Sequence, residues 1–170
     1  MLDGIDGARL ALVGLTCLGL AVFGGVLAGD ALRSWYPTLV KPRFQISTPL
    51  FIGVGIVVYV LEAVVLYRLI GLVDGSPGPT IALASLLVVM VYNELWNAAL
   101  FRLRSVLAGW IGLLGFLAPL AILELALVLV DPPSAALMFV YLLWVVGYDV
   151  PWIYQLWRAN RVAAEDAARA

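Results

Sequence analysis

Four acidic side chains stand inside long apolar runs of the chain, namely Glu62, Glu94, Glu124 and Asp149. If those runs cross a membrane, a charge at the bilayer centre costs about 2.5–3.5 kcal/mol. The acids should therefore face the interior of a helix bundle or be protonated. By helical rise, Glu94 lies about 10 Å and Asp149 about 12 Å from the ends of their runs, so both can stand at one level. Glu62 falls near mid-membrane, whereas Glu124 belongs to the opposite half and should be unrelated to them.

Aromatic and amide side chains accompany three of these acids at helical spacing, since residues three or four apart share one face of a helix. The faces consist of Gly55, Tyr59 and Glu62, of Asn93, Trp96, Asn97 and Leu100, and of Tyr141, Trp144 and Tyr148. Together they have the composition of a pocket for a flat, mostly apolar ligand. Interhelical hydrogen bonding and aromatic packing explain the same residues, so both interpretations stay open. A proton path is a weaker interpretation, because the acids do not plainly form a chain across the membrane.

The residue types that the sequence lacks exclude several chemistries. The chain has no His, and Cys17 is its one cysteine. Zinc sites built on His, His-ligated haem, His acid–base catalysis and intrachain disulfides are therefore excluded. Lys41 is the only lysine and lies among loop residues, which argues against a Schiff base buried in a helix. A net charge of −1 without a long basic cluster argues against nucleic acid as a partner.

The elements that must position these side chains are five long apolar segments. Of the 170 residues, 64% are hydrophobic and 12% are charged, and the mean hydropathy is +1.06, so a bilayer is the natural solvent. The segments cover residues 10–29, 49–73, 79–101, 105–130 and 134–157, and a tail follows at 158–170. Because their apolar character is continuous rather than alternating, a β-barrel is excluded. The sequence predicts an all-α membrane protein, with one domain over residues 1–170 that is a bundle of five transmembrane helices.

Positive residues are unevenly divided between the two ends of these helices. One side holds Arg33, Lys41, Arg43, Arg102, Arg104, Arg158, Arg161 and Arg169, and the other holds Arg9 and Arg68. Since Lys and Arg favour cytoplasmic loops, we expect a multi-pass membrane protein with its N-terminus outside and its C-terminus in the cytoplasm. Arg68 stands about one turn inside a helix end, from which its guanidinium can extend to the interface.

Small residues recur at every fourth position of the first segment, at Cys17, Ala21, Gly25 and Gly29. Such a stripe lets two helix backbones approach each other closely. The approaching helix can belong to the same chain or to a second copy, so a homodimer is one of two interpretations.

Four short patterns along the chain resemble those of one known family. They are Trp35-Tyr36-Pro37-Thr38-Leu39-Val40-Lys41-Pro42-Arg43-Phe44, Asn93-x-x-Trp96-x-x-x-Leu100-Phe101-x-x-Arg104, residues 135–144 ending in Tyr141-Leu142-Leu143-Trp144, and Tyr154-Gln155-Leu156-Trp157-Arg158-Ala159-Asn160. They look like the W-Y-x-x-L-x-K-P-x-F/W, N-x-x-W-x-x-x-F-F-x-x-R, A-x-L-x-x-P-Y-L-x-W and Y-x-x-W-R-x-N patterns of the TspO/MBR family of translocator proteins and tryptophan-rich sensory proteins. Their order and near-family spacing extend the resemblance over nearly the whole chain.

The chain departs from the family pattern at several positions, as a divergent member or sister branch would. Ile46-Ser47 stands where the family has Pro-Pro, and Gly55, Val89, Val140 and Ile153 stand where it has tryptophan, glutamine, proline and asparagine. One extra residue also lies between Trp144 and Tyr154.

The resemblance implies a five-helix bundle, often a homodimer, with a cavity that opens toward the loop between the first two helices. Family members bind porphyrins, sterol-like lipids and synthetic apolar drugs, so a porphyrin or haem-type ligand is expected. Some bacterial members degrade protoporphyrin in light, a chemistry that relies on paired pocket tryptophans. Because Gly55 occupies one of those positions and Trp144 the other, we expect binding without that degradation, or a different ligand.

The expected ligand site combines the family patterns with the polar helix faces. Its candidate residues are Trp35, Tyr36, Pro42, Phe44, Tyr59, Glu62, Asn93, Glu94, Trp96, Asn97, Tyr141, Trp144, Tyr148 and Asp149. Lys41 or Arg43 would pair with porphyrin propionates at the cavity mouth, and positive-inside anchoring explains both residues equally well. Val150, Tyr154 and Arg158 match a sterol-type pattern, which an interfacial belt of Tyr and Arg also explains.

Three functions remain as hypotheses. The leading one is a membrane-embedded binding or sensory protein for a flat apolar ligand, whose partners are lipid, that ligand and in one interpretation a second copy. The second is a small transporter that couples protons on Glu62, Glu94 and Asp149 to its substrate. The third is a light- or carboxylate-dependent enzyme on a membrane-embedded substrate, which the lack of His makes less favoured.

Overall fold

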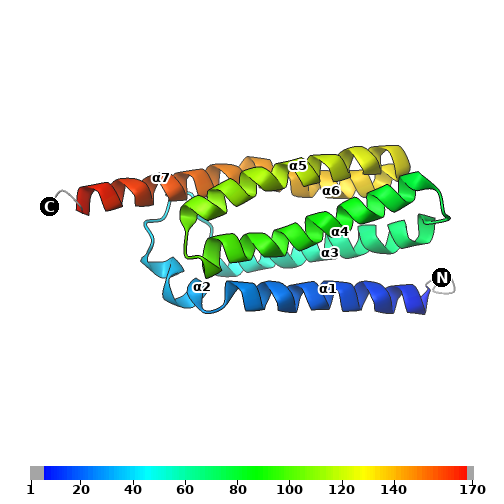
Figure 1. Cartoon of the computed structure of the whole chain (residues 1–170), viewed down its shortest axis with the longest axis horizontal. Helices are drawn as coiled ribbons and strands as arrows, with labels where there is room; N and C mark the ends of the chain where they lie inside the picture. The colour runs from blue at the N-terminus through cyan, green and yellow to red at the C-terminus, as the bar shows by residue number, and fades with distance from the viewer. Residues whose placement is uncertain (1–5, 168–170) are drawn as a thin grey trace.

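The computed structural model describes residues 6–167, and this part of the chain contains helices and their connections without a strand. Five long helical segments run side by side along the molecule (Figure 1). They are α1 (Gly7–Ala28), α3 (Thr48–Leu72), α4 (Pro77–Asn97) continued by η2 (Ala98–Arg102), α5 (Val106–Val130), and a last segment of α6 (Pro132–Trp144), η3 (Val145–Asp149) and α7 (Val150–Ala167). The connection between α1 and α3 holds α2 (Ala31–Ser34) and η1 (Tyr36–Thr38). The predicted all-α, five-helix bundle is confirmed.

Each of the five segments is long and apolar enough to cross a membrane. Their bounds differ from the predicted ones where proline begins a helix, because α4 begins at Pro77 and α6 at Pro132, residues that the sequence places in turns. Proline lacks an N–H group, but the first helical turn does not use it. The last segment continues past residue 157 to Ala167. Arg169, which the sequence assigns to the tail, lies outside the described residues.

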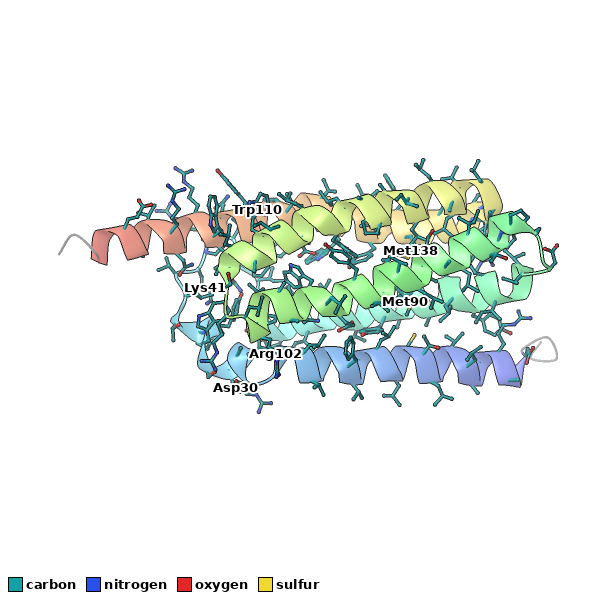
Figure 2. All side chains as sticks on the ribbon, in the orientation of Figure 1. Asp30, Lys41, Met90, Arg102, Trp110 and Met138 are labelled. Atoms are coloured by element: carbon teal, nitrogen blue, oxygen red, sulfur yellow. The ribbon has the colours of Figure 1, made fainter. Side chains whose placement is uncertain are left out.

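The core of the bundle is formed by buried side chains of α3, α4, α5 and the last segment. α5 packs against α4, α6 and α7, whereas α1 lies at the edge, against α3 and α4 (Figure 1). Buried methionines fill the middle of the bundle, where Figure 2 places Met90 and Met138. The outward surface is apolar as well, and Leu129 exposes 86% of its area. Such a surface suits contact with hydrocarbon rather than water.

One ion pair joins the last turns of α3 to the connection between α5 and α6. The guanidinium of Arg68 donates to both carboxylate oxygens of Asp131, at 2.8 Å from Nε and 2.7 Å from Nη2. The Ser134 hydroxyl donates to the same carboxylate at 2.5 Å. These hydrogen bonds hold the pKa of Asp131 below its usual range. Arg68 is thus fixed by a partner in the chain rather than extended freely to the interface.

We expect Asp131→Asn to lower the free energy of unfolding by about 1–2 kcal/mol at neutral pH, since it removes a charge-assisted pair whose Arg68 is partly exposed. Because the folded protein lowers the pKa of Asp131, the contribution is present above the ordinary aspartate pKa of about 4 and is lost as pH falls below it. Thermal unfolding in detergent across this pH range measures the effect.

Asp74→Asn is the matched control, because the exposed Asp74 carboxylate accepts a hydrogen bond from the nearby backbone N–H of Ser76, at 2.9 Å. Its unfolding temperature should change less than that of Asp131→Asn. Equal losses in the two variants, or a loss in Asp131→Asn that persists in acid, would contradict the assigned pair.

Candidate ligand-binding site

A cavity of about 420 Å³ lies in the half of the bundle nearest the connection between α1 and α3. Its position follows from its lining, which comes from the end of α1, the start of α3, the end of α4, the middle of α5, and the junction of α6 and η3. The lining residues are Ala21, Gly24, Gly25, Ala28, Phe51, Ile52, Val54, Gly55, Ile56, Val58, Tyr59, Asn93, Glu94, Trp96, Asn97, Leu113, Phe116, Tyr141, Trp144, Val145 and Asp149. The volume lies in the range of small-molecule sites, about 300–1,000 Å³.

Aromatic rings held by their own contacts form much of the cavity wall. The indole N–H of Trp96 donates to the backbone oxygen of Gly109 at 2.9 Å, which ties α4 to α5. The Trp144 ring packs on that of Tyr148, with 4.6 Å between the ring centres. Phe116 and Tyr141 meet at 6.1 Å between their centres. The walls are therefore fixed surfaces on which a flat ligand can stack.

A hydrogen-bonded carboxylate stands in this aromatic surround. The Tyr59 hydroxyl donates to Oε1 of Glu94, and the Asn97 amide donates to Oε2 at 3.1 Å. Glu94 is only 4% exposed, and a Cβ atom built on Gly24 would collide with its carboxylate. The missing side chain of Gly24 on α1 thus makes room for the carboxyl group of Glu94 on α4.

Two further polar residues reach the cavity from the last segment. The Tyr141 hydroxyl donates to Oδ1 of Asn93 at 3.2 Å. Asp149 lines the cavity from η3, a π-helical turn with one extra residue per hydrogen-bonded ring. Its Oδ1 atom is buried and accepts no hydrogen bond from the described residues. Asp149 therefore presents an unused acceptor.

Two other acids lie outside the cavity lining. Glu62 on α3 is 1% exposed, and its Oε1 atom has no hydrogen-bond partner among the described residues. Glu124 on α5 has an unpartnered, buried Oε2 atom. Sequence reasoning grouped Glu62 with Glu94 and Asp149, whereas the structure brings only the latter two to the cavity wall.

The loop residues that the family resemblance nominates lie apart from the cavity. Trp35, Tyr36, Pro42 and Phe44 do not line it in the described part of the chain. Tyr36 is buried beside Gln45, which donates to its hydroxyl at 2.6 Å. Phe44 meets the ring of Tyr148 edge-on, with 6.1 Å between ring centres. Tyr148 itself supports the wall from behind, through Trp144.

The two loop cations also differ in surroundings. The Lys41 ammonium donates to the backbone oxygens of Tyr36 and Leu39, the second at 3.3 Å, and lies 3.8 Å from the centre of the Tyr36 ring. Partial burial lowers the pKa of Lys41. Arg43 is exposed. Figure 2 places Lys41 with Asp30 and Arg102 at the end of the bundle, away from Met90.

Hydrogen bonds tie this loop to the last helical segment. Asn160 bonds both the N–H and the carbonyl of Val40, each at 3.0 Å. The Trp152 indole donates to Gln45 at 3.0 Å, and the backbone N–H of Ile46 donates to the Tyr148 hydroxyl at 3.0 Å. The resemblance implied a cavity that opens toward this loop, but no residue of 30–47 lines it.

The cavity opens instead between α1 and α3. Ala21 and Gly25 on α1, and Ile52, Gly55 and Ile56 on α3, line the cavity and are exposed at the side of the bundle. A Cβ atom built on Gly25 or Gly55 would meet nothing within 4 Å, so the helices stand apart there. The gap therefore opens toward the surrounding lipid.

The residues of the sterol-type pattern lie on the far side of the last segment. Tyr154 is exposed and packs beside Trp110 and Trp157, with ring centres 5.4 and 6.0 Å away. Arg158 is exposed, Val150 is half-buried, and neither lines the cavity within the described residues.

Fold and site together define an integral membrane protein of several passes with an aromatic cavity between its helices. The model of the TspO/MBR family matches residues 12–150, and the chain belongs to that family. It is similar to the tryptophan-rich protein TspO of Chlorobaculum tepidum, at 26% identity over 133 residues that cover 76% of this chain and 84% of that protein. The resemblance found in the sequence is thereby confirmed.

Sequence reasoning missed the contributions of α1 and α5 to the cavity. Gly24 lies one residue before Gly25 of the small-residue stripe, and its buried neighbour Glu94 explains the need for glycine. Phe116 lies on α5, four residues after Gly112, so it shares a face with a glycine that the Trp96 ring approaches. The sequence signal for these contributions is a glycine on one helix where a large side chain of a neighbouring helix approaches.

Gly24→Ala should destabilise the protein relative to Gly25→Ala by about 1–2 kcal/mol, because the new Cβ displaces Glu94 from its hydrogen bonds. Alanine favours a helix over glycine at both positions, so this gain cancels in the comparison. Unfolding temperatures of the two purified variants measure the difference. Equal stability of the pair would mean that Glu94 does not occupy the space above Gly24.

Proposed function

We propose that this protein binds a flat, mostly apolar small molecule, of the porphyrin or sterol-like class, in the cavity between its helices. Membership of the TspO/MBR family indicates a membrane sensory or binding protein. The observation that carries the proposal is the cavity of about 420 Å³ with ordered aromatic walls and few polar groups. A flat ring system gains both apolar burial and stacking in such a space.

The side opening supports a route from the bilayer. An apolar ligand concentrates in the membrane, and the gap between α1 and α3 joins the cavity to that phase. The unequal division of Lys and Arg supports an orientation with the α1–α3 loop and the C-terminus in the cytoplasm. In this orientation the cavity lies in the cytoplasmic half of the membrane. A homodimer through the exposed positions of α1 remains a prediction.

The two other hypotheses have less support. A proton-coupled transporter needs a connected path, yet no hydrogen bond joins any two of Glu62, Glu94, Glu124 and Asp149 in the described chain. In the family, light-driven degradation relies on a pair of pocket tryptophans. Here Gly55 occupies one of those two positions, so the pair is incomplete. Binding is therefore the function that the geometry supports best.

Titration with protoporphyrin IX should quench tryptophan fluorescence at micromolar concentrations, and Trp144→Ala should weaken binding roughly tenfold by removing a stacking surface from the wall. Trp110→Ala is the matched control, because Trp110 is also half-buried but packs on Tyr154 outside the cavity lining. A sterol analogue measured by competition extends the test to the second ligand class. No quenching at these concentrations by protoporphyrin and no competition by the sterol would refute the proposal, as would equal losses in the two variants.

A further inference from the structure

The ionisable side chains at the cavity wall are all acidic. Glu94 and Asp149 line the cavity, and no Lys or Arg lines it among residues 6–167. The nearest loop lysine, Lys41, already donates to two backbone carbonyls. Building on the proposed function, we propose that the flat apolar ligand carries a protonated amine, which pairs with the Asp149 carboxylate.

Glu94 lines the cavity without being the main contact. Its two oxygen atoms each accept a hydrogen bond, one from the Tyr59 hydroxyl and one from the Asn97 amide. Both carboxyl oxygens therefore already serve as acceptors. Glu94 adds a second acidic group to the cavity wall, but its hydrogen-bonding capacity is largely used.

Asp149 supplies the contact itself. Its Oδ1 atom is buried, belongs to a residue that lines the cavity, and has no donor among the described residues. A buried acceptor without a partner is costly, and a donor on the ligand removes that cost. An ammonium group satisfies the oxygen and also neutralises the charge, which a neutral hydroxyl does only in part.

The same charges select against acidic ligands. A carboxylate or phosphate on the ligand would face Glu94 and Asp149 with no cation in the described lining to offset the repulsion. The predicted ligand class is therefore a flat polycyclic molecule that presents an amine to this wall. A porphyrin in the cavity would have its propionates pointing away from the wall.

Three pyrene compounds of one ring size test the charge preference on the purified full chain, in an uncharged detergent near neutral pH. Pyrenemethylamine is cationic, pyrenemethanol is neutral and pyrenecarboxylic acid is anionic, and energy transfer from tryptophan to pyrene reports binding. We expect the amine to bind roughly tenfold or more tightly than the alcohol, and the acid to bind most weakly. Asp149→Asn should reduce the amine-to-alcohol ratio to near one.

Glu124→Gln is the matched control, since Glu124 is a carboxylate of the same bundle with an unpartnered oxygen but outside the cavity lining. It should keep the wild-type ratio, and Glu94→Gln should lower it less than Asp149→Asn does. Equal binding of the three compounds to the wild type, or a ratio unchanged in Asp149→Asn, overturns the amine inference and leaves the proposed function intact. If none of the three compounds binds, the inference falls together with the apolar-ligand site.

Discussion

Hydrocarbon offers no hydrogen bonds, so polar groups within the five spans must find their partners inside the bundle. The arrangement of the cavity follows from this constraint. Glu94 turns away from lipid and meets Tyr59 and Asn97, while Asn93 meets Tyr141. Because these side chains come from α3, α4 and α6, their hydrogen bonds hold three helices around one space.

The cavity depends on glycines in α1 and α3 and on the π-helical turn in the last segment. Gly24 leaves room for the Glu94 carboxylate, and Gly25 and Gly55 leave the side of the bundle open. In the last segment, the π-helical turn η3 lies between Trp144 and Tyr154, where the family resemblance predicts one extra residue. A π turn accommodates one inserted residue within a continuous helix. Asp149 stands at the end of this turn and lines the cavity.

The sequence was enough to predict five helices and the family, because continuous apolar runs and spaced motifs are local signals. It also nominated Glu94, Trp96 and Trp144, which line the cavity in the structure. It could not separate Tyr148 from Trp144, or Glu62 from Tyr59, on the same helix faces, since a helix face is broader than a cavity wall. Loop residues such as Phe44 were nominated by resemblance, and their distance from the cavity depends on hydrogen bonds with the last segment that no local pattern reveals.

The basic residues of the loop and the acidic residues of the cavity lie in different parts of the protein. Lys41 and Arg43 belong to a loop that is hydrogen-bonded to the last segment. The Lys41 ammonium donates its hydrogen bonds to backbone oxygens within that loop. Glu94 and Asp149 lie deeper, in the lining of the cavity. Under the proposed function, a ligand that enters through the side gap meets these acids before it meets the loop cations. Under that proposal, ligand selection rests on the inner acids rather than on the loop.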